Sequence, residues 1–431
     1  MYLCKFKNVL TWIINILLIC IVLLISIPIK SIFGIDISKY VLISYFMLAM
    51  FLFVMDKQIK TIVYTSIHDI FVFLFILIWL FFGLFNGYTI AINFFNGLVI
   101  PLITFIITYY LYKFNFIQKK KMMCTLCIAL ALFLLEKLFF EFTYIFKIFS
   151  YDEIRNIYFN VFNSNIITMT FNIGNLTLIR LQSSTDCIFY TMLPILLVDE
   201  NIKNNVKIVL LVLSTLFTII VFSRIYIVHF VSILILCLIL NGKLLYKNFI
   251  SKFDKKKLYI LGSMSVVLLI ILISNILEPI LVRFLEDGLF SDSIRNEQAI
   301  KLFDGFKEHP LIGHGMGSYL SEYVRSQVVP YSYEKEYISF LYQFGVIGFI
   351  LVIVGTMSIY IGKIYFLMKK KTTSIKLCIY LSLLWYMLRP LFNPSFIGLS
   401  NNFIFIVLLI YLNFSIQEEV DTNDISCTCD I

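Results

Sequence analysis

Charged side chains are scarce in this sequence, and their scarcity limits the classes of protein to which it can belong. Asp, Glu, Lys and Arg make up 14% of the 431 residues, whereas hydrophobic residues make up 60%. The mean hydropathy is +0.93. A typical soluble domain has about 25% charged residues, because its surface faces water. The composition therefore excludes an ordinary soluble protein and indicates an integral membrane protein.

Features that would indicate a metalloprotein, a secreted protein or a symmetric transporter are also missing. Cys124 and Cys127 form a C-x-x-C pair, but no second pair follows, so the sequence predicts no metal site. The apolar run at 9–29 is too long for a signal-peptide core and lacks a small-residue cleavage site. We interpret it as an uncleaved first span. The sequence shows no convincing internal repeat.

Apolar runs long enough to cross a bilayer recur along the whole chain. A span needs about 20 apolar residues, and the runs fall at 9–29, 39–55, 70–86, 90–112, 122–148, 185–199, 206–222, 225–241, 258–277, 344–367, 376–391 and 399–415. This pattern predicts an all-α polytopic membrane protein with about twelve transmembrane helices. The predicted parts are nine helices in 1–277 with an outer loop at 150–184, a large extracytoplasmic loop at 278–343, three helices in 344–415, and a cytoplasmic tail at 416–431.

Lysines set the predicted orientation, because basic residues accumulate in cytoplasmic loops. With the N-terminus inside, the inner loops and the N-terminal segment hold 21 of the 35 basic residues. Only the first outer loop, with Lys30 and Lys39, opposes this bias. We therefore expect both termini in the cytoplasm and the segments 150–184 and 278–336 outside. The net charge of +9 follows from the bias and predicts no nucleic-acid partner.

Arginine is rare, and its distribution differs from that of lysine. The chain has 28 lysines and seven arginines, and every arginine falls on the predicted outer side: Arg155, Arg180, Arg224, Arg283, Arg295, Arg325 and Arg389. Arg224 follows Ser223 in a tight turn between two spans, where charge is costly. A planar guanidinium binds phosphate or carboxylate through two parallel hydrogen bonds. We predict that several arginines converge on one outer cavity and hold a pyrophosphate there; seven separate surface positions are the alternative.

The longest polar segment, 278–348, contains the densest glycine pattern. A helical pattern ends at His309 and Pro310, and the glycines that follow permit a sharp turn or close approach to a ligand: Gly313, Gly315 and Gly317. No predicted strand precedes them, so they do not indicate a nucleotide-binding loop. A second helical pattern starts near Glu334 and continues into the next span. We interpret this segment as an outer cap over the bundle that carries the site.

The order of several short motifs resembles the O-antigen polymerase and ligase superfamily. Two loop elements of that superfamily are matched by HPLIGHGMG, which starts at His309, and by EKEYISFLYQFGVIG, which starts at Glu334. A Ser–Arg turn between spans is matched by Ser223 and Arg224. The remaining arginine motifs are matched by Arg180, Arg283 and Arg295. The similarity covers roughly residues 175–348.

The resemblance implies a GT-C-like membrane glycosyltransferase that needs neither a metal nor a cofactor. It implies catalytic roles for Glu334, Arg224 and Arg295, and substrate binding by Arg180, Arg283, His309, Gly313, His314, Gly315, Gly317 and Tyr337. The implied substrates are polyprenyl-pyrophosphate-linked donor and acceptor glycans, and the implied location is the bacterial cytoplasmic membrane. Membrane lipid, a flippase and a chain-length regulator are the further partners.

One departure separates the two branches of the superfamily. Ligases carry a His–Asn pair where this chain has Glu334 and Lys335, eleven residues before Gly345. A glutamate there is similar to repeat-unit polymerases. We therefore favour a polymerase that makes O-antigen, capsule or exopolysaccharide over a ligase that transfers polymer to a lipid acceptor. Glu334 would serve as a base or orient the acceptor; alternatively, it pairs with Lys335 or a loop arginine and only shapes the cap.

A transporter of polysaccharide or lipid-linked sugar is the competing class. Transporters usually have two related halves and a polar site near the midplane, whereas the halves here are unequal and the large loop lies on one side. A structural scaffold would leave the arginine bias unexplained. Among the intramembrane charges, Lys137 and Glu141 lie one turn apart and are interpreted as a pair. His229 is interpreted as a core residue.

Overall fold

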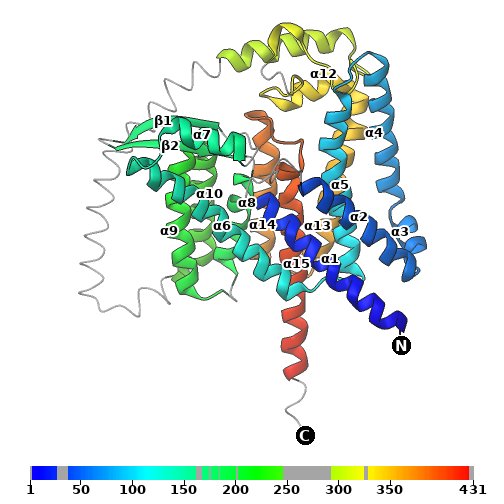
Figure 1. The fold of residues 1–431 in the computed structure, drawn as a ribbon, viewed down its shortest axis with the longest axis vertical. Helices are drawn as coiled ribbons and strands as arrows, with labels where there is room; N and C mark the ends of the chain where they lie inside the picture. The colour runs from blue at the N-terminus through cyan, green and yellow to red at the C-terminus, as the bar shows by residue number, and fades with distance from the viewer. Residues whose placement is uncertain are drawn as a thin grey trace.

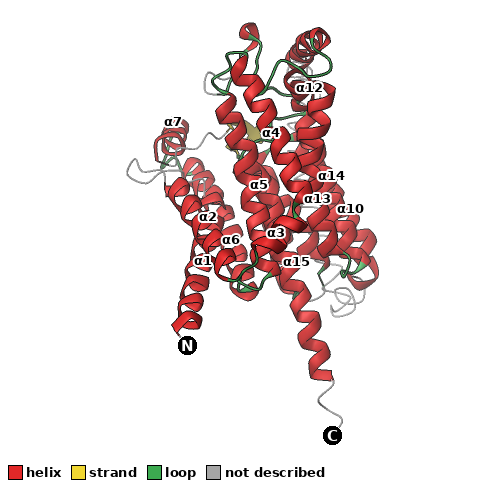
Figure 2. Cartoon of the chain, turned by 90° about the vertical axis from the view of Figure 1, so that its right-hand side faces the viewer, coloured by secondary structure: helices red, strands yellow, loops and turns green. Residues whose placement is uncertain are grey.

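The computed structural model describes a helical bundle with a cap and a β-hairpin at one end (Figure 1). The described residues are 2–26, 37–161, 167–173, 176–183, 185–199, 202–245, 293–324 and 329–426. Figure 2 shows the same bundle from the side, with its helices running along one common direction.

Long apolar helices form the body of the bundle, because a backbone in lipid must satisfy its hydrogen bonds internally. The first half contains α1 (Tyr2–Ser26), α2 (Ile37–Met55), α3 (Ile59–Thr65), α4 (Ile67–Phe85), α5 (Ala91–Lys113) and α6 (Lys119–Ile145). The second half contains α8 (Asp186–Val198), α9 (Asn204–Val221), α10 (Arg224–Leu245), α12 (Glu336–Gly348), α13 (Gly355–Met368), α14 (Thr373–Leu388) and α15 (Leu399–Ser426). Short 3₁₀ and π turns lie between these elements: η1 (Ile157–Val161), η3 (Ser321–Tyr323), η4 (Phe349–Val354) and η5 (Arg389–Leu391).

The helices agree with the polytopic all-α membrane class that the sequence predicts. Within the described residues, six stretches are long and apolar enough to cross a membrane, and four shorter apolar helices accompany them. Helices occupy eleven of the twelve predicted spans. The twelfth, 258–277, lies outside the described residues. The number of spans, the domain boundaries and the GT-C likeness stay predictions.

Helix α15 forms the centre of the bundle. Each residue from Phe403 to Leu412 is at most 1% exposed, and the helix packs against α5, α6, α8 and α13. A helix that is apolar on all faces is typical of a buried core element. Figure 1 shows the first part of this helix among the other helices, whereas its C-terminal part projects beyond them.

The outer segment at 150–184, which the sequence predicts as a loop, contains a short helix and a β-hairpin. Helix α7 (Tyr151–Asn156) begins with a capping box, in which the Ser150 amide donates to the Glu153 carboxylate at 2.7 Å. Strands β1 (Ile167–Ile173) and β2 (Leu176–Gln182) pair antiparallel. Strand β1 is rich in the β-branched residues Ile and Thr, which favour strands. Strand β2 packs against α6 and α9.

The two ends of the bundle differ in what they carry. Helix α7, the hairpin and the helix at 293–308 lie at one end, whereas both chain termini lie at the other (Figure 1, Figure 2). Termini at one end of the bundle are what the lysine pattern predicts. The side of the membrane on which each end lies stays a prediction.

Helix α12 is broken inside its apolar stretch. Gly345 has φ 62° and ψ −175°, which no helix tolerates. The amides that follow the break bond the chain at 310–311 instead, with Val346 N donating to the Pro310 carbonyl at 2.9 Å and Ile347 N to the Leu311 carbonyl at 3.0 Å. The break in α12 therefore allows the helix to hydrogen-bond the polar chain at 310–311 directly.

Candidate active site at the hairpin end of the bundle

The turn between α9 and α10, here called the arginine turn (residues 221–224), lies beside the hairpin. Helix α9 ends at Val221 because Phe222 adopts a left-handed conformation, with φ 38° and ψ 50°. The Phe222 ring stacks on Phe171 of β1 with the ring centres 4.2 Å apart. Ser223 is buried, and Arg224 then begins α10. The turn is therefore held in place by the hairpin.

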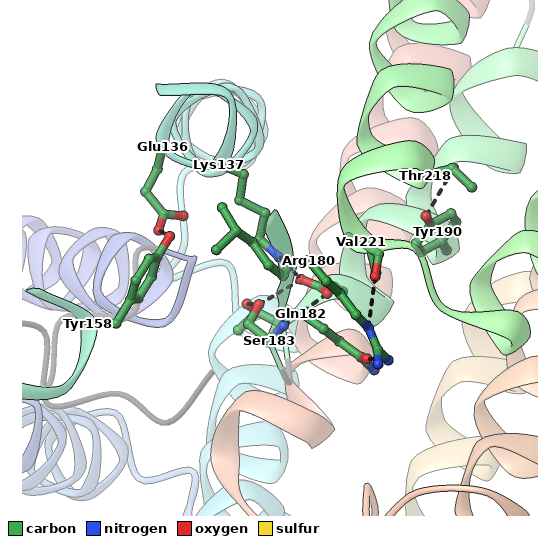
Figure 3. Close-up of polar contacts among 12 residues, drawn as sticks. Glu136, Lys137, Tyr158, Arg180, Gln182, Ser183, Tyr190, Thr218 and Val221 are labelled. Carbon is green, nitrogen blue, oxygen red and sulfur yellow. Dashed lines mark hydrogen bonds and ion pairs between the residues drawn. The ribbon is translucent and has the colours of Figure 1, made fainter. Parts of the chain in front are cut away.

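Arg180 of β2 reaches across to the arginine turn (Figure 3). Its Nε donates to the Val221 carbonyl at 3.2 Å, and its other nitrogens donate to Met169 Sδ at 3.3 Å and to the Gln182 side chain. Arg180 is 8% exposed. These bonds fix the planar guanidinium beside Val221, three positions before Arg224 in the chain.

A buried ion pair joins β2 to α6 and α8 directly below Arg180. Lys137 Nζ lies 2.5 Å from Asp186 Oδ1 and donates to the Leu181 carbonyl at 2.8 Å. Asp186 also accepts from the Ser183 amide at 3.0 Å and from Ser183 Oγ at 2.6 Å. The interpretation of Lys137 and Glu141 as a pair is wrong. Glu141 instead accepts from the Ile179 amide at 3.1 Å.

The same end of α6 holds the chain that enters the hairpin. Tyr158 of η1 donates its hydroxyl to the Glu136 carboxylate, as Figure 3 shows. Glu136 therefore bonds η1, whereas Lys137 and Glu141 both bond β2. The charges that the sequence places inside a span serve to attach the hairpin, because strand backbone near lipid needs polar partners.

Arg389, at the end of α14, is a third arginine at this end of the bundle. It is 6% exposed, lies with its guanidinium carbon 5.9 Å from the centre of the Tyr226 ring, and donates to Asn401 Oδ1 at 3.5 Å. Arg180 and Arg389 both lie within electrostatic reach of Tyr226. The outer-side bias of arginine includes Arg389, but no motif marks it, so the sequence prediction leaves it out of the site.

Glu336 is the second residue that the sequence prediction missed. Its buried carboxylate accepts from the Ser395 amide at 2.7 Å and from the Phe396 amide at 2.8 Å, and Arg389 acts on it electrostatically. Tyr337, predicted to bind substrate, donates its hydroxyl to the Met387 carbonyl at 2.7 Å. The start of α12 is therefore packed on the end of α14, next to Arg389.

The cap is formed by the helix at 293–308 and the chain from 309 to 335. Arg295 Nε donates to the Glu334 carboxylate, and Lys335 Nζ donates to Asn296 Oδ1 at 2.5 Å. Tyr333, the residue before Glu334, is buried, and this burial raises the pKa of its hydroxyl to about 12. The hydroxyl therefore stays protonated. Glu334 thus pairs with a loop arginine, the alternative that the sequence left open. Whether it is also a base stays a prediction.

The glycines of the cap approach the protein's own backbone. Gly313, Gly315 and Gly317 all have positive φ. A Cβ on Gly315 would lie 2.8 Å from Gly83 Cα of α4, and one on Gly317 would lie 2.7 Å from Ala91 Cα of α5. Close packing of the loop at 309–317, here called the glycine loop, accounts for these glycines. Their contact with substrate stays a prediction.

The two histidines of the glycine loop meet edge to face, and His314 stacks on α12. The His309 and His314 ring centres lie 4.7 Å apart, and His314 stacks on Tyr342 at 4.4 Å. His314 Nε2 also forms a 2.8 Å hydrogen bond with the Gly305 carbonyl. Arg283 lies outside the described residues. A shared cavity that joins Arg295 to the arginine turn stays a prediction.

These elements define a polytopic helical membrane protein with arginines gathered around a turn at one end. Residues 209–353 match the family model described as O-antigen ligase. The resemblance to the O-antigen polymerase and ligase superfamily is therefore confirmed, and the matched segment includes the arginine turn, the cap and the broken helix α12. No curated protein and no solved structure matches the chain significantly.

Proposed function

We propose that this protein is a membrane glycosyltransferase that polymerises lipid-pyrophosphate-linked oligosaccharide units into a surface polysaccharide. The observation that carries the proposal is the position of three arginines: Arg180 bonds the arginine turn, Arg224 begins α10 at that turn, and Arg389 lies over the Tyr226 ring of α10. The turn lies inside the segment that matches the family. Such a protein would act in the bacterial cytoplasmic membrane, with the hairpin end outside.

The chemistry of the leaving group supports a cluster of guanidinium groups. When the sugar leaves a lipid pyrophosphate, negative charge develops on the pyrophosphate oxygens, and fixed donors nearby lower the barrier. Arginine forks suit these oxygens because they donate two parallel hydrogen bonds. Arg180 and Arg389 are held by neighbouring side chains and backbone, so little reorganisation is needed when the charge develops. In this role they would replace a divalent cation.

The second substrate is the hydroxyl of an acceptor glycan, and Glu334 is the proposed residue for it. A carboxylate within hydrogen-bond reach of the hydroxyl can accept its proton as the new glycosidic bond forms. The carboxylate is presented by the segment before α12, and Arg295 fixes its orientation. Tyr337 and the histidines of the glycine loop are proposed to line the path of the sugar chain.

We favour polymerisation over ligation because Glu334 and Lys335 replace the His–Asn pair of ligases. A flippase would supply the lipid-linked units, and a chain-length regulator would act on the same growing polymer. The family model itself is described as O-antigen ligase, so ligation is the second candidate.

Glycan analysis of a deletion strain tests the proposal. Without the protein, we expect single repeat units on the surface and no ladder of longer chains, and complementation should restore the ladder. Full-length polymer that stays on its lipid carrier would instead identify a ligase. Lipid-linked units confined to the cytoplasmic leaflet would identify a transporter and contradict the proposed enzyme.

A further inference from the structure

A small cavity lies beside the arginine turn, between α8, α10 and α14. Its walls include Thr191, Tyr226, His229, Trp385 and Arg389. The space is enough for about one water molecule. The residues that the sequence predicts for the site do not line this cavity, but Arg389 does, so the cavity adjoins the proposed site.

Two buried polar atoms on the cavity wall have no hydrogen-bond partner among the described residues: Tyr226 Oη and His229 Nε2. Tyr226 is 2% exposed and His229 is 5% exposed. Buried polar groups nearly always have a partner, because leaving one without a hydrogen bond is costly. The absence of a protein partner for two groups around one cavity therefore indicates a bound molecule.

Neither side chain can turn to find another partner, because stacking holds both rings. Tyr226 stacks on Tyr190 with the ring centres 4.7 Å apart and an angle of 8° between the rings. His229 stacks on Trp385 at 4.9 Å and 22°. Trp385 is itself fixed, since its Nε1 donates to Ser232 Oγ at 2.9 Å. Both rings are therefore held in place at the cavity wall.

We propose that this cavity binds one water molecule, which hydrogen-bonds Tyr226 Oη, His229 Nε2 and the Arg389 guanidinium. A water can both donate and accept, so it satisfies a hydroxyl, a ring nitrogen and a cation at once. Tyr226 and His229 are then positioning residues, because the water fixes Arg389 at the arginine turn. The effect on the substrate rests on the proposed function, whereas the water site does not.

Replacing Tyr226 with Phe tests the water site without any substrate. Tyr226→Phe keeps the ring and removes only the hydroxyl. Tyr360→Phe is the matched control, because Tyr360 is also buried, its hydroxyl has no partner in the described part of the chain, and it does not line the cavity. In lipid nanodiscs, Tyr226→Phe should lower the Tm by about 2 °C, because the water loses a partner. Tyr360→Phe should leave the Tm unchanged or raise it.

An equal or higher Tm for Tyr226→Phe would overturn the water site, and so would an equal fall for both variants. Exchanging chloride for gluconate should leave the Tm of the natural protein unchanged; a fall would mean that the occupant is chloride and not water. These three measurements are independent of the reaction. They therefore separate a failure of the water site from a failure of the proposed function.

The positioning role has its own readout in the kinetics. With a lipid-pyrophosphate-linked donor, Tyr226→Phe should raise the donor KM about threefold and change kcat less. In an Arg389→Lys background the same substitution should not raise the donor KM further, because the guanidinium that Tyr226 positions is already gone. Independent, multiplying effects of the two substitutions would contradict the positioning role.

Discussion

Arg295 and Glu334 form an ion pair that joins the first turn of the cap helix to the segment before α12. Each side chain is 13% exposed, so the pair is largely shielded from water and contributes more than an exposed pair would. Two residues with separately predicted catalytic roles are therefore one structural unit. Any test of Glu334 as a base must separate its chemistry from its part in holding the cap.

Exchanging the charges of Glu334 and Arg295 separates these two roles of Glu334. Glu334→Gln should reduce polymer formation about 100-fold or more if the carboxylate is the base. The double variant Glu334→Arg/Arg295→Glu keeps an ion pair across the cap but moves the carboxylate to the other side. We expect it to remain inactive on a chain-length gel. Restored polymer would show that the pair shapes the cap and that Glu334 is not the base.

Arg180→Lys should reduce activity by about 10- to 100-fold. Lysine keeps the positive charge but lacks the planar guanidinium and the hydrogen bond that Arg180 Nε donates to the Val221 carbonyl. The matched control is Arg155→Lys, since Arg155 is an exposed residue of α7 away from the arginine turn. It should keep near-normal activity. Turnover of a lipid-linked donor by the purified variants measures both, and equal losses would contradict a specific role for Arg180.

Lys137→Met should destabilise the protein by about 3–5 kcal/mol, because Asp186 is then left as a buried charge without its partner. Lys307→Met, which breaks an exposed pair with Asp304, should cost about 1 kcal/mol or less. The double variant Lys137→Met/Asp186→Leu should recover part of the loss. Unfolding in mixed detergent micelles measures all three, and a small effect of Lys137→Met would argue against the buried pair.

Gly315→Ala should destabilise the packing of the glycine loop by about 1–3 kcal/mol. Its φ of 101° strains any side chain, and the added Cβ would lie 2.8 Å from the backbone of α4. Gly362→Ala is the control, because Gly362 lies inside α13 with open space around it, and alanine there should be neutral or stabilising by about 0.5–1 kcal/mol. Thermal unfolding compares the two, and similar effects would contradict the packing explanation.

Cysteine labelling tests the orientation. Ile300, on the outer face of the cap helix, is 61% exposed, and Lys370 lies in the short connection between α13 and α14. In a variant without other cysteines, Ile300→Cys should react with a membrane-impermeant reagent in intact cells, and Lys370→Cys should react only after lysis. The reverse pattern would contradict the topology and place the arginine turn on the wrong side for the proposed reaction.

The helices were predictable because lipid imposes a strong pattern on the sequence. A run of apolar residues in a bilayer has few alternatives to helix, so eleven predicted spans coincide with helices. The hairpin was not predictable to the same degree, since its two seven-residue strands are too short to stand out within an outer loop. Their stability comes from contacts with α6, α9 and Phe222 that the local sequence does not reveal.

The site was predictable only where residue type alone carries the information. The rarity of arginine marks Arg180 and Arg224, and the structure bonds Arg180 to the turn that precedes Arg224. The convergence of their side chains on one cavity stays a prediction. Lys137 was assigned to the neighbouring Glu141 because the two lie one turn apart, but its partner, Asp186, is 49 residues away. No motif marks Arg389 or Glu336, and their burial within electrostatic reach of each other follows only from the packing of α12 on η5.

The contact between the glycine loop and α4 also determines the order in which this protein can be assembled. Trp79 donates its Nε1 to the Ile312 carbonyl, 233 residues further along the chain. At a synthesis rate of about 5–20 residues per second, the ribosome needs roughly 10–50 s to make the residues between them. During that interval α4 and α5 are already in the membrane without the loop that fills the space between their outer ends. The packing of the N-terminal helices is therefore completed only after a segment that is made late in synthesis arrives.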